Sequence, residues 1–444
     1  MKPSVYRILC ALTTLVLAAS LCFALIEAYK SRSEAKRWRE TQRAGGVPRF
    51  WESQEHIKTT LMNPPDAQFV VATDSGGKAV KRTESHGFAE DNDVAIACTA
   101  GHRLFCVGDS VTYGILPNSQ AFPDLLEAML DPTRNAWQVV NAGKGGESTY
   151  TALLRYKYVV SQYDFNGLIV GWFAGNEPVE MTREGVYAGP RVRKVAGGWS
   201  TRWEDDTPLQ YITDADVDLF LPAIEEQFRA KGRPLREDGQ DPMVFLKANS
   251  GNSGVLSRRY ALYGGTSFIS AFHFLRYKPK HEKKLHEDLQ AFVVRTLAVV
   301  RAFKDSLGDR LLYVVIPEAY EVNPGFVLCH PDFQVLLAAL ELNEEDMSTA
   351  TFLRRWFMDL LDHEGVSYVD PVNEMKTVKD SSSVFRADDL HPTMQGNLAI
   401  AKAIARQSDF FRRTAQSQPS KTTPIGSPGV ISSPLPNNRQ FPHR

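Results

Sequence analysis

The stretch LFCVGDSVTYG, residues 104–114, decides the fold. Its first four residues form a short apolar run that is typical of a buried strand, and Gly108, Asp109 and Ser110 follow at once. A serine at a junction between a strand and a helix has its hydroxyl group outside the sheet and its N–H group near a helix N-terminus. The stretch therefore predicts a strand of an α/β sheet with Ser110 at its carboxyl end.

The same alternation of apolar runs and amphipathic stretches continues along the chain. Further strands are predicted at 137–141, 168–173, 311–316 and 366–370, and a separate short strand is predicted at 69–71, before the alternation begins. Helices are predicted at 121–130, 151–160, about 281–307, 351–362 and from about Met394. Strand and helix in repeated succession indicate an α/β fold with a parallel sheet covered on both faces. Ligands of such sheets bind beyond the carboxyl ends of the strands, which is where functional residues are expected.

Polar residues collect at these predicted strand ends and near the C-terminus. The segments are GDSVTYG at 108–114, NAGKGGES at 141–148, AGNE at 174–177 and DDLHP at 388–392. A serine needs a base to remove its proton, and Asp388 and His391 are close enough on one turn for both to face a single site. Gly146 lets the backbone approach a substrate, and Asn176 can donate two hydrogen bonds without adding charge.

Each of these residues alone also has a structural interpretation. Ser110 could cap the following helix, and His391 could be a structural histidine. Gly146 could be only a turn, and Asn176 only an Asx turn before Pro178. The four segments together, each at the end of an apolar run, favour catalysis.

In this order, the four segments resemble the signature blocks of the SGNH hydrolase superfamily, the GDSL-like lipases and esterases. The resemblance covers roughly residues 103–408, apart from an insertion at about 180–266, and it implies a three-layer α/β/α flavodoxin-like fold. It implies Ser110 as nucleophile, His391 as general base and Asp388 as the orienting carboxylate. The implied oxyanion hole consists of the Ser110 amide, the Gly146 amide and the Asn176 side chain.

Two positions depart from the family pattern, and one pair of acids needs a choice. Ala174 and Glu177 stand where the third block commonly has glycine and aspartate, which affects the shape of the loop rather than the donor. Asp389 lies beside Asp388, but the DxxH spacing selects Asp388.

The resemblance implies a serine esterase that hydrolyses acyl esters through a Ser110 acyl-enzyme. We expect no cofactor and no metal, because the sequence has no phosphate-binding loop and no HExxH or CxxC motif. Two alternatives stay open: an O-acyltransferase that uses the same triad, and a non-catalytic envelope binding protein. Neither the acyl chain, the alcohol nor the oligomeric state is predicted.

The N-terminus predicts a membrane segment. The uncharged run from Ile8 to Ile26 has a length of about 28 Å as a helix, close to the thickness of a bilayer's hydrocarbon core. We expect a signal anchor rather than a cleaved signal peptide, because the small residues Ala18 to Ser20 fall inside the run. Basic residues at 30–43 favour a cytoplasmic body by the positive-inside rule, whereas the short basic leader favours export. We expect a catalytic domain outside the cytoplasm, anchored in the cell envelope, with secretion as the alternative.

The remaining organisation follows from composition. We predict an anchor or signal at 1–30, a stalk and extension at 31–99, and a hydrolase domain at 100–413 interrupted by an insertion at about 180–266. A disordered tail rich in Pro and Ser is predicted at 414–444. The net charge of −1 gives no support for a nucleic-acid partner. Of the cysteines outside the anchor, Cys98 and Cys106 could form a bridge, but the unpaired state is favoured.

Overall fold

The computed structural model describes most of the chain between residues 60 and 417. The described ranges are 60–73, 77–133, 135–204, 206–231, 282–329, 348–379, 383–386 and 391–417. The chain divides into the units Met1–Ile57 and Lys58–Arg444, and all of these ranges lie in the second. Within them, no helix has the length and apolar character of a membrane span. The predicted anchor at 8–26, Asp388 and residues 418–444 lie outside the described residues.

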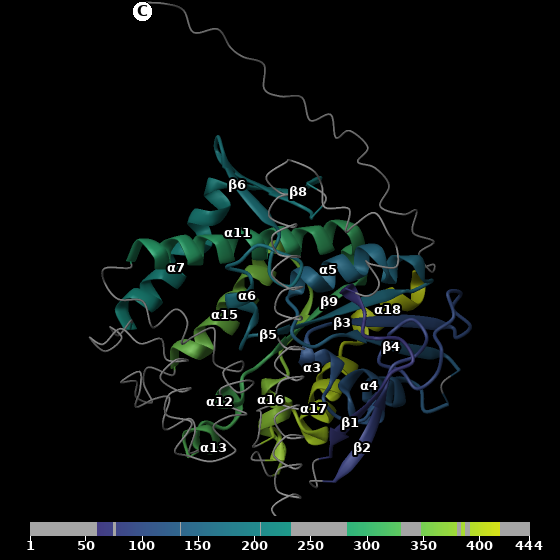
Figure 1. The fold of residues 1–444 in the computed structure, drawn as a ribbon. Coiled ribbons are helices and arrows are strands. Elements are labelled where there is room, and N and C mark those ends of the chain that lie inside the picture. Colours follow the sequence, from purple (N-terminus) through teal and green to yellow (C-terminus); the bar gives the residue numbers. More distant parts are fainter. Residues whose placement is uncertain are drawn as a thin grey trace, which may run out of the picture. The chain divides into compact units, whose positions relative to one another are not determined.

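A five-stranded sheet forms the centre of the fold (Figure 1). Its strands are β3 (His102–Gly108), β4 (Trp137–Gly143), β5 (Gly167–Phe173), β9 (Leu311–Ile316) and β10 (Tyr368–Val369). They lie in the order β4-β3-β5-β9-β10, and every pairing is parallel. Numbered along the chain, this is the 2-1-3-4-5 order of flavodoxin-like sheets. The predicted parallel α/β sheet is confirmed, although β10 is shorter than the predicted strand at 366–370.

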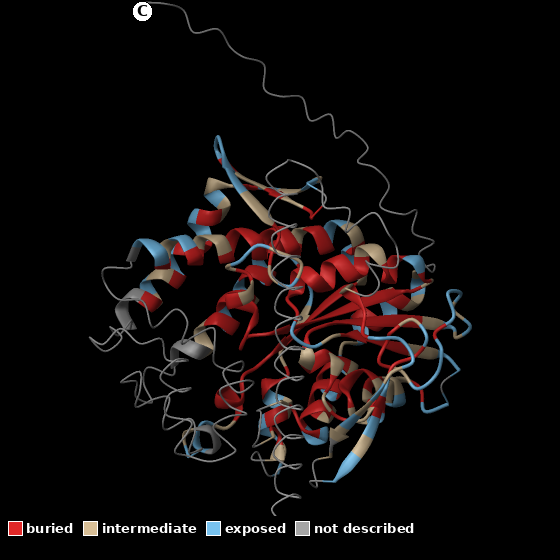
Figure 2. Cartoon of the chain, viewed as in Figure 1, coloured by how far each residue is buried: buried red, intermediate tan, exposed pale blue. Residues whose placement is uncertain are grey.

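Helices cover both faces of this sheet, so β5 and β9 are buried throughout their length, and β3 and β4 are buried except at their first residues (Figure 2). The longer helices are α4 (Phe122–Leu130), α5 (Thr149–Tyr158), α11 (Glu282–Leu307), α15 (Ser348–Glu364), α17 (Met394–Ala405) and α18 (Ser408–Gln416). Helices α5, α11 and α15 pack on one face, where Trp172 of β5 stacks on Phe357 with ring centroids 4.0 Å apart. On the other face, next to α4 and α17, Trp137 of β4 meets Phe411 of α18 edge to face. Burial on both faces explains why these strands are continuous apolar runs.

Short elements complete the described domain. They are the helices α3 (Ser110–Tyr113), α6 (Glu177–Glu180), α12 (Ala319–Val322), α13 (Pro324–Leu328) and α16 (Val372–Lys376), and the antiparallel strands β1 (Gln68–Ala72) and β2 (Lys78–Arg82). Residues 60–99 belong to the same compact unit as the sheet, with Leu61 and Phe88 fully buried. Cys98, Cys106 and Cys329 are free thiols.

The crossover from β5 to β9 contains a second, separate sheet. Its strands β6 (Arg191–Val195), β7 (Gly198–Arg202) and β8 (Pro208–Thr213) are antiparallel and lead into α7 (Asp214–Lys231). Arg301 of α11 joins this region to the main fold, because it pairs with Asp216 at 2.8 Å and with Glu364 at 2.7 Å. The predicted insertion beginning near 180 has no clear sequence period, whereas these residues form regular structure. Residues 232–281, which contain its predicted end near 266, lie outside the described part.

The C-terminal boundary differs from the prediction of a tail that begins at 414. Helix α18 continues to Gln416, and Thr414 is fully buried. A Cβ atom on Gly167 would lie 2.7 Å from the Thr414 methyl group, so this helix packs against the start of β5. Asn166, just before β5, donates to the Ser417 carbonyl at 3.0 Å. Residues 414–417 are therefore part of the folded domain.

Candidate active site

Ser110 and His391 meet at the carboxyl edge of the sheet. His391 Nε2 lies 2.9 Å from Ser110 Oγ, although the two residues are 281 positions apart in the sequence. The N-cap of α3 is Asp109, whose Oδ1 accepts from the Val111 N–H at 2.9 Å. Ser110 is thus not needed as the helix cap. Its hydroxyl group is within hydrogen-bonding distance of an imidazole nitrogen, as a nucleophile and its base require.

Glycines at the strand ends allow this junction to form. A Cβ atom on Gly143, at the end of β4, would lie 2.3 Å from the Tyr113 amide nitrogen. Thr112 is wedged between β3 and β5, since a Cβ atom on Gly108 or on Gly171 would lie 2.2 Å from its hydroxyl oxygen. No side chain fits at these three positions, so α3 lies directly against three strand ends and Ser110 is held at the edge.

The loop after β4 passes beside Ser110 and presents Gly146. A Cβ atom on Gly145 would lie 3.7 Å from the Ser110 Cβ atom, whereas one on Gly146 would meet nothing within 4 Å. Gly146 has a φ of 75°, a conformation that favours glycine. The Lys144 amide donates to the Gly108 carbonyl at 3.0 Å and ties the loop to β3. The predicted donor Gly146 therefore stands in a turn that is close to Ser110 and faces open space.

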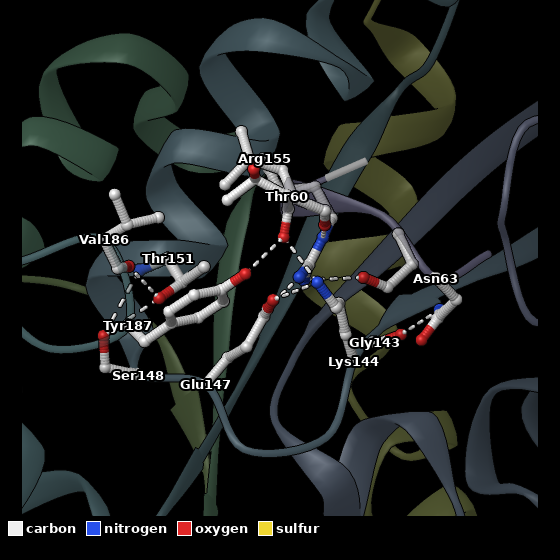
Figure 3. A network of polar contacts seen from close by, with 12 residues as sticks. Thr60, Asn63, Gly143, Lys144, Glu147, Ser148, Thr151, Arg155, Val186 and Tyr187 are labelled. Carbon is white, nitrogen blue, oxygen red and sulfur yellow. Dashed lines mark hydrogen bonds and ion pairs between the residues drawn. The ribbon is translucent and has the colours of Figure 1, made fainter. Parts of the chain in front are cut away.

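Buried charges hold the base of this loop (Figure 3). Glu147 is fully buried and forms an ion pair with Arg155 of α5 and another with Lys144 at 3.3 Å. Arg155 also donates to the carbonyl groups of Ala142 at 2.9 Å and Leu61 at 2.6 Å. Burial lowers the pKa of Arg155 to about 9, so its side chain remains charged at neutral pH. This arrangement fixes both ends of the loop that carries Gly146.

The N-terminal segment of the described domain contributes to the same network. Asn63 Nδ2 donates to the Gly143 carbonyl at 3.0 Å, and the Tyr187 hydroxyl group donates to the Thr60 carbonyl at 3.1 Å. Lys144 Nζ donates to the same Thr60 carbonyl. These supporting residues were not predicted from the sequence. The one sequence feature that points to them is the presence of the charged residues Lys144, Glu147 and Arg155 in and after the predicted site loop.

Asn176 follows β5 on the other side of Ser110. It is the N-cap of α6, but its side chain makes no capping hydrogen bond, so the Asx-turn interpretation does not hold. Instead Asn176 Nδ2 donates to Glu180 Oε1 at 3.4 Å. With 8% of its surface exposed, Asn176 lies in a nearly closed environment.

Three acidic side chains surround Asn176. Asp109 and Glu177 are fully buried, and Glu177 accepts from the Thr149 amide at 2.8 Å. Burial raises the pKa of Asp109, against the lowering effects of the Val111 amide and His391. Burial and the neighbouring carboxyl groups raise the pKa of Glu177 well above its ordinary value and that of Glu180 to about 8. In the sequence, Glu177 is recognised only as a departure from the family pattern, and no pattern points to Glu180.

The structure thus brings together four of the five predicted site residues at one edge of the sheet, namely Ser110, Gly146, Asn176 and His391. Asp388 lies outside the described residues. Within the described ranges, no group of three or more His, Cys, Asp or Glu side chains is arranged to hold a metal ion.

Fold and site together define the class of this protein: a doubly wound parallel α/β protein with a serine–histidine pair at the carboxyl edge of its sheet. No protein-family model matches the chain, and no curated protein matches its sequence. Solved structures similar to it include a protein described as a lipolytic member of the G-D-S-L family from Desulfitobacterium hafniense, with a TM-score of 0.30 and 10% identity over 69% of this chain and 98% of that one.

Two further similar structures come from other bacteria. One is a lipase/acylhydrolase from Enterococcus faecalis, with a TM-score of 0.32 and 12% identity, covering 72% of this chain and 100% of that one. The other is an acetyl xylan esterase from Geobacillus stearothermophilus, with a TM-score of 0.31 and 12% identity, covering 73% and 98%. At these identities and TM-scores, the function proposed below rests on the site residues themselves.

Proposed function

We propose that this protein is a serine esterase that hydrolyses acyl esters through a covalent Ser110 intermediate. The observation that carries the proposal is the 2.9 Å distance between Ser110 Oγ and His391 Nε2 at the carboxyl edge of the sheet. At that distance a neutral imidazole can accept the hydroxyl proton as the oxygen attacks a carbonyl carbon. The resemblance of the four sequence segments to the SGNH blocks supports the same chemistry.

The proposed reaction has two halves. Ser110 Oγ bonds to the ester carbonyl carbon while its proton passes to His391, and the carbonyl oxygen becomes an oxyanion. When the bond to the alcohol breaks, His391 returns the proton to the leaving oxygen, and the acyl group stays on Ser110. A water molecule then attacks the acyl-enzyme with His391 again as base, which releases the acid and restores Ser110.

The oxyanion is the proposed target of three donors. These are the Ser110 amide, the Gly146 amide and the Asn176 side chain, and Asp388 is proposed to orient His391. Two observations support this assignment: the Gly145–Gly146 turn passes beside Ser110, and Asn176 stands at the end of the neighbouring strand β5. Fixed donors at the position where charge develops supply a large share of catalysis in acyl transfer.

We further propose that the substrate is an O-acylated glycan or lipid of the cell envelope. Residues 8–26 would anchor the chain in the membrane with the catalytic domain outside the cytoplasm. A secreted form is the alternative for the same sequence pattern. Envelope polymers and lipids carry the ester bonds on which this chemistry acts.

The proposal is tested by labelling the full-length chain with a fluorophosphonate and by assaying short-chain and long-chain aryl esters. We expect covalent modification of Ser110 and ester hydrolysis, both abolished by Ser110→Ala and strongly reduced by His391→Ala. Ser306→Ala is the matched control, because its hydroxyl group donates within α11 to the Ala302 carbonyl at 2.8 Å. Folded wild-type protein that neither reacts nor hydrolyses any ester would instead favour a non-catalytic binding protein.

Product analysis separates hydrolysis from transfer. An acylated donor is incubated with and without an acceptor glycan, and the free acid is quantified. Free acid in both incubations supports the esterase. An ester conserved on the acceptor identifies an O-acyltransferase that uses the same intermediate.

A further inference from the structure

The side chain of Asn176 interacts with two carboxyl groups in the described structure, those of Glu180 and Asp109. Its Nδ2 atom lies 3.4 Å from Glu180 Oε1, four residues further along the chain. Its Oδ1 atom is buried and has no partner among the described residues. The orientation of the Asn176 amide therefore depends on these two carboxyl groups, of which Glu180 is within hydrogen-bonding distance of Nδ2.

The surroundings of Glu180 are acidic. Asp109, Glu177 and Glu180 each bury one carboxyl oxygen that has no hydrogen-bond partner within the described ranges, namely Oδ2, Oε1 and Oε2. The cationic groups that act on them are Arg183 for Glu180 and, when protonated, His391 for Asp109. Tyr313 of β9 lies close enough to Glu177 to be affected by its charge. Three ionised carboxylates in this space would be costly, since a buried charge requires a partner.

Protonation of Glu180 lowers this cost and supplies a hydrogen-bond donor for Asn176 Oδ1. A carboxylic acid has an O–H donor, which can satisfy Asn176 Oδ1 after the amide group turns over. Both N–H groups of Asn176 are then free of Glu180. An ionised Glu180 has the opposite effect, because it draws an Asn176 N–H group to itself and places a negative charge beside the oxyanion.

We propose that Glu180 is a positioning residue of the oxyanion hole, whose protonated carboxyl group orients the Asn176 amide toward the substrate and keeps the site free of a competing charge. This inference rests on the proposed esterase function. The pKa of Glu180, which burial and Asp109 raise to about 8, supports a neutral carboxyl group at neutral pH. Loss of that proton lowers the rate of Ser110 acylation.

The test is the pH dependence of kcat/KM on an aryl ester, measured for the full-length wild-type chain and for Glu180→Gln. Gln keeps the hydrogen bond to Asn176 and cannot ionise. The wild-type value falls roughly tenfold or more as pH rises from about 7 to about 9, on the scale expected for a new charge near the oxyanion. Glu180→Gln retains at least about half of the wild-type value at neutral pH and lacks this alkaline fall.

Two variants serve as controls. Glu184→Gln removes a half-exposed carboxyl group of the same segment, and it keeps the wild-type profile. Glu177→Gln removes the neighbouring buried carboxyl group. An alkaline fall that persists in Glu180→Gln, or that only Glu177→Gln abolishes, overturns the proposal.

An infrared titration of the unliganded protein tests the same proton without activity. We expect a band of a protonated buried carboxyl group that disappears near pH 8 and is missing from Glu180→Gln. Its presence in Glu180→Gln with unchanged intensity contradicts the proposal. Failure of Ser110 to react with a fluorophosphonate at any pH would refute the esterase function instead, and the infrared result would still decide the protonation of Glu180.

Discussion

The two sides of the proposed oxyanion hole differ in the charged groups that support them. The Gly146 loop stands on Glu147, whose charge is balanced by Arg155 and Lys144. The Asn176 turn stands among carboxyl groups whose pKa values burial raises. The first side is held by ion pairs, and burial lowers the pKa of Lys144 to about 8 and that of Arg155 to about 9. The second side depends on protonated carboxyl groups instead of ion pairs, so the two sides should respond differently to mutation and to pH.

The largest effect is expected from removing the guanidinium group of Arg155, which balances the charge of Glu147. Arg155→Met leaves Glu147 buried without its main partner, and we expect the free energy of unfolding to fall by about 3–5 kcal/mol. Chemical denaturation measures this loss. The control is Arg412→Ala, which removes an exposed pair with Asp409 and should cost about 1 kcal/mol or less. The double variant Arg155→Met/Glu147→Leu should recover part of the loss, and equal losses in Arg155→Met and Arg412→Ala would contradict the buried-charge interpretation.

The second-largest effect is expected from removing the proposed oxyanion donor Asn176. Asn176→Ala should lower kcat on an aryl ester by about 10²–10³-fold, or about 3 kcal/mol of transition-state stabilisation, with a smaller change in KM. Asn166→Ala is the matched control, because Asn166 is also buried but lies at the amino end of β5, where it accepts from the Arg103 amide. That control should lose stability and keep kcat. A kcat that is unchanged in Asn176→Ala would remove Asn176 from the oxyanion hole.

The pH dependence of stability provides a third comparison. The pKa of Glu180 is higher in the folded protein, about 8, than in an unfolded chain, so folding binds a proton between these values. Its contribution to stability is present below the unfolded pKa and is lost as pH rises toward 8, at up to about 1.4 kcal/mol per pH unit. Denaturation at several pH values should show a flatter dependence in Glu180→Gln than in wild type. Parallel curves for the two proteins would mean that Glu180 is ionised in the folded state.

The smallest effect is expected at Lys144. Its side chain is 17% exposed, and Glu147 keeps Arg155 when Lys144 is removed. Lys144→Met should therefore cost about 1 kcal/mol, much less than Arg155→Met. The same denaturation assay measures it. A loss as large as that of Arg155→Met would show that the amine, rather than the guanidinium group, balances Glu147.

The main sheet could be predicted from the sequence because burial on both faces leaves a simple pattern. Runs such as LIVGWF and LLYVVI have no polar position, and the structure places them in β5 and β9. The site residues at the strand ends followed from the same pattern, since the carboxyl ends of parallel strands share one edge. The position of His391 next to Ser110 depended on the resemblance, because no local signal joins them.

Other parts could not be read from local patterns. Strand β6, with the sequence RVRKV, is largely exposed and has too little apolar character to be recognised. Thr414 is buried only because α18 returns to the start of β5, a contact between residues far apart in the chain. For the same reason, the closeness of Asp109 to Asn176 and Glu180 follows from the packing of α3 against α6 rather than from sequence spacing.

The two ends of the described domain lie at opposite edges of the sheet. Thr60 contacts Lys144 and Tyr187 beside the loop that follows β4, whereas Ser417 is bonded to Asn166 where β5 begins. A support or fluorophore coupled at position 417 would thus be separated from Ser110 by the length of the strands. Coupling at this position should leave substrates unhindered, which makes it the better choice for binding measurements on an immobilised sample.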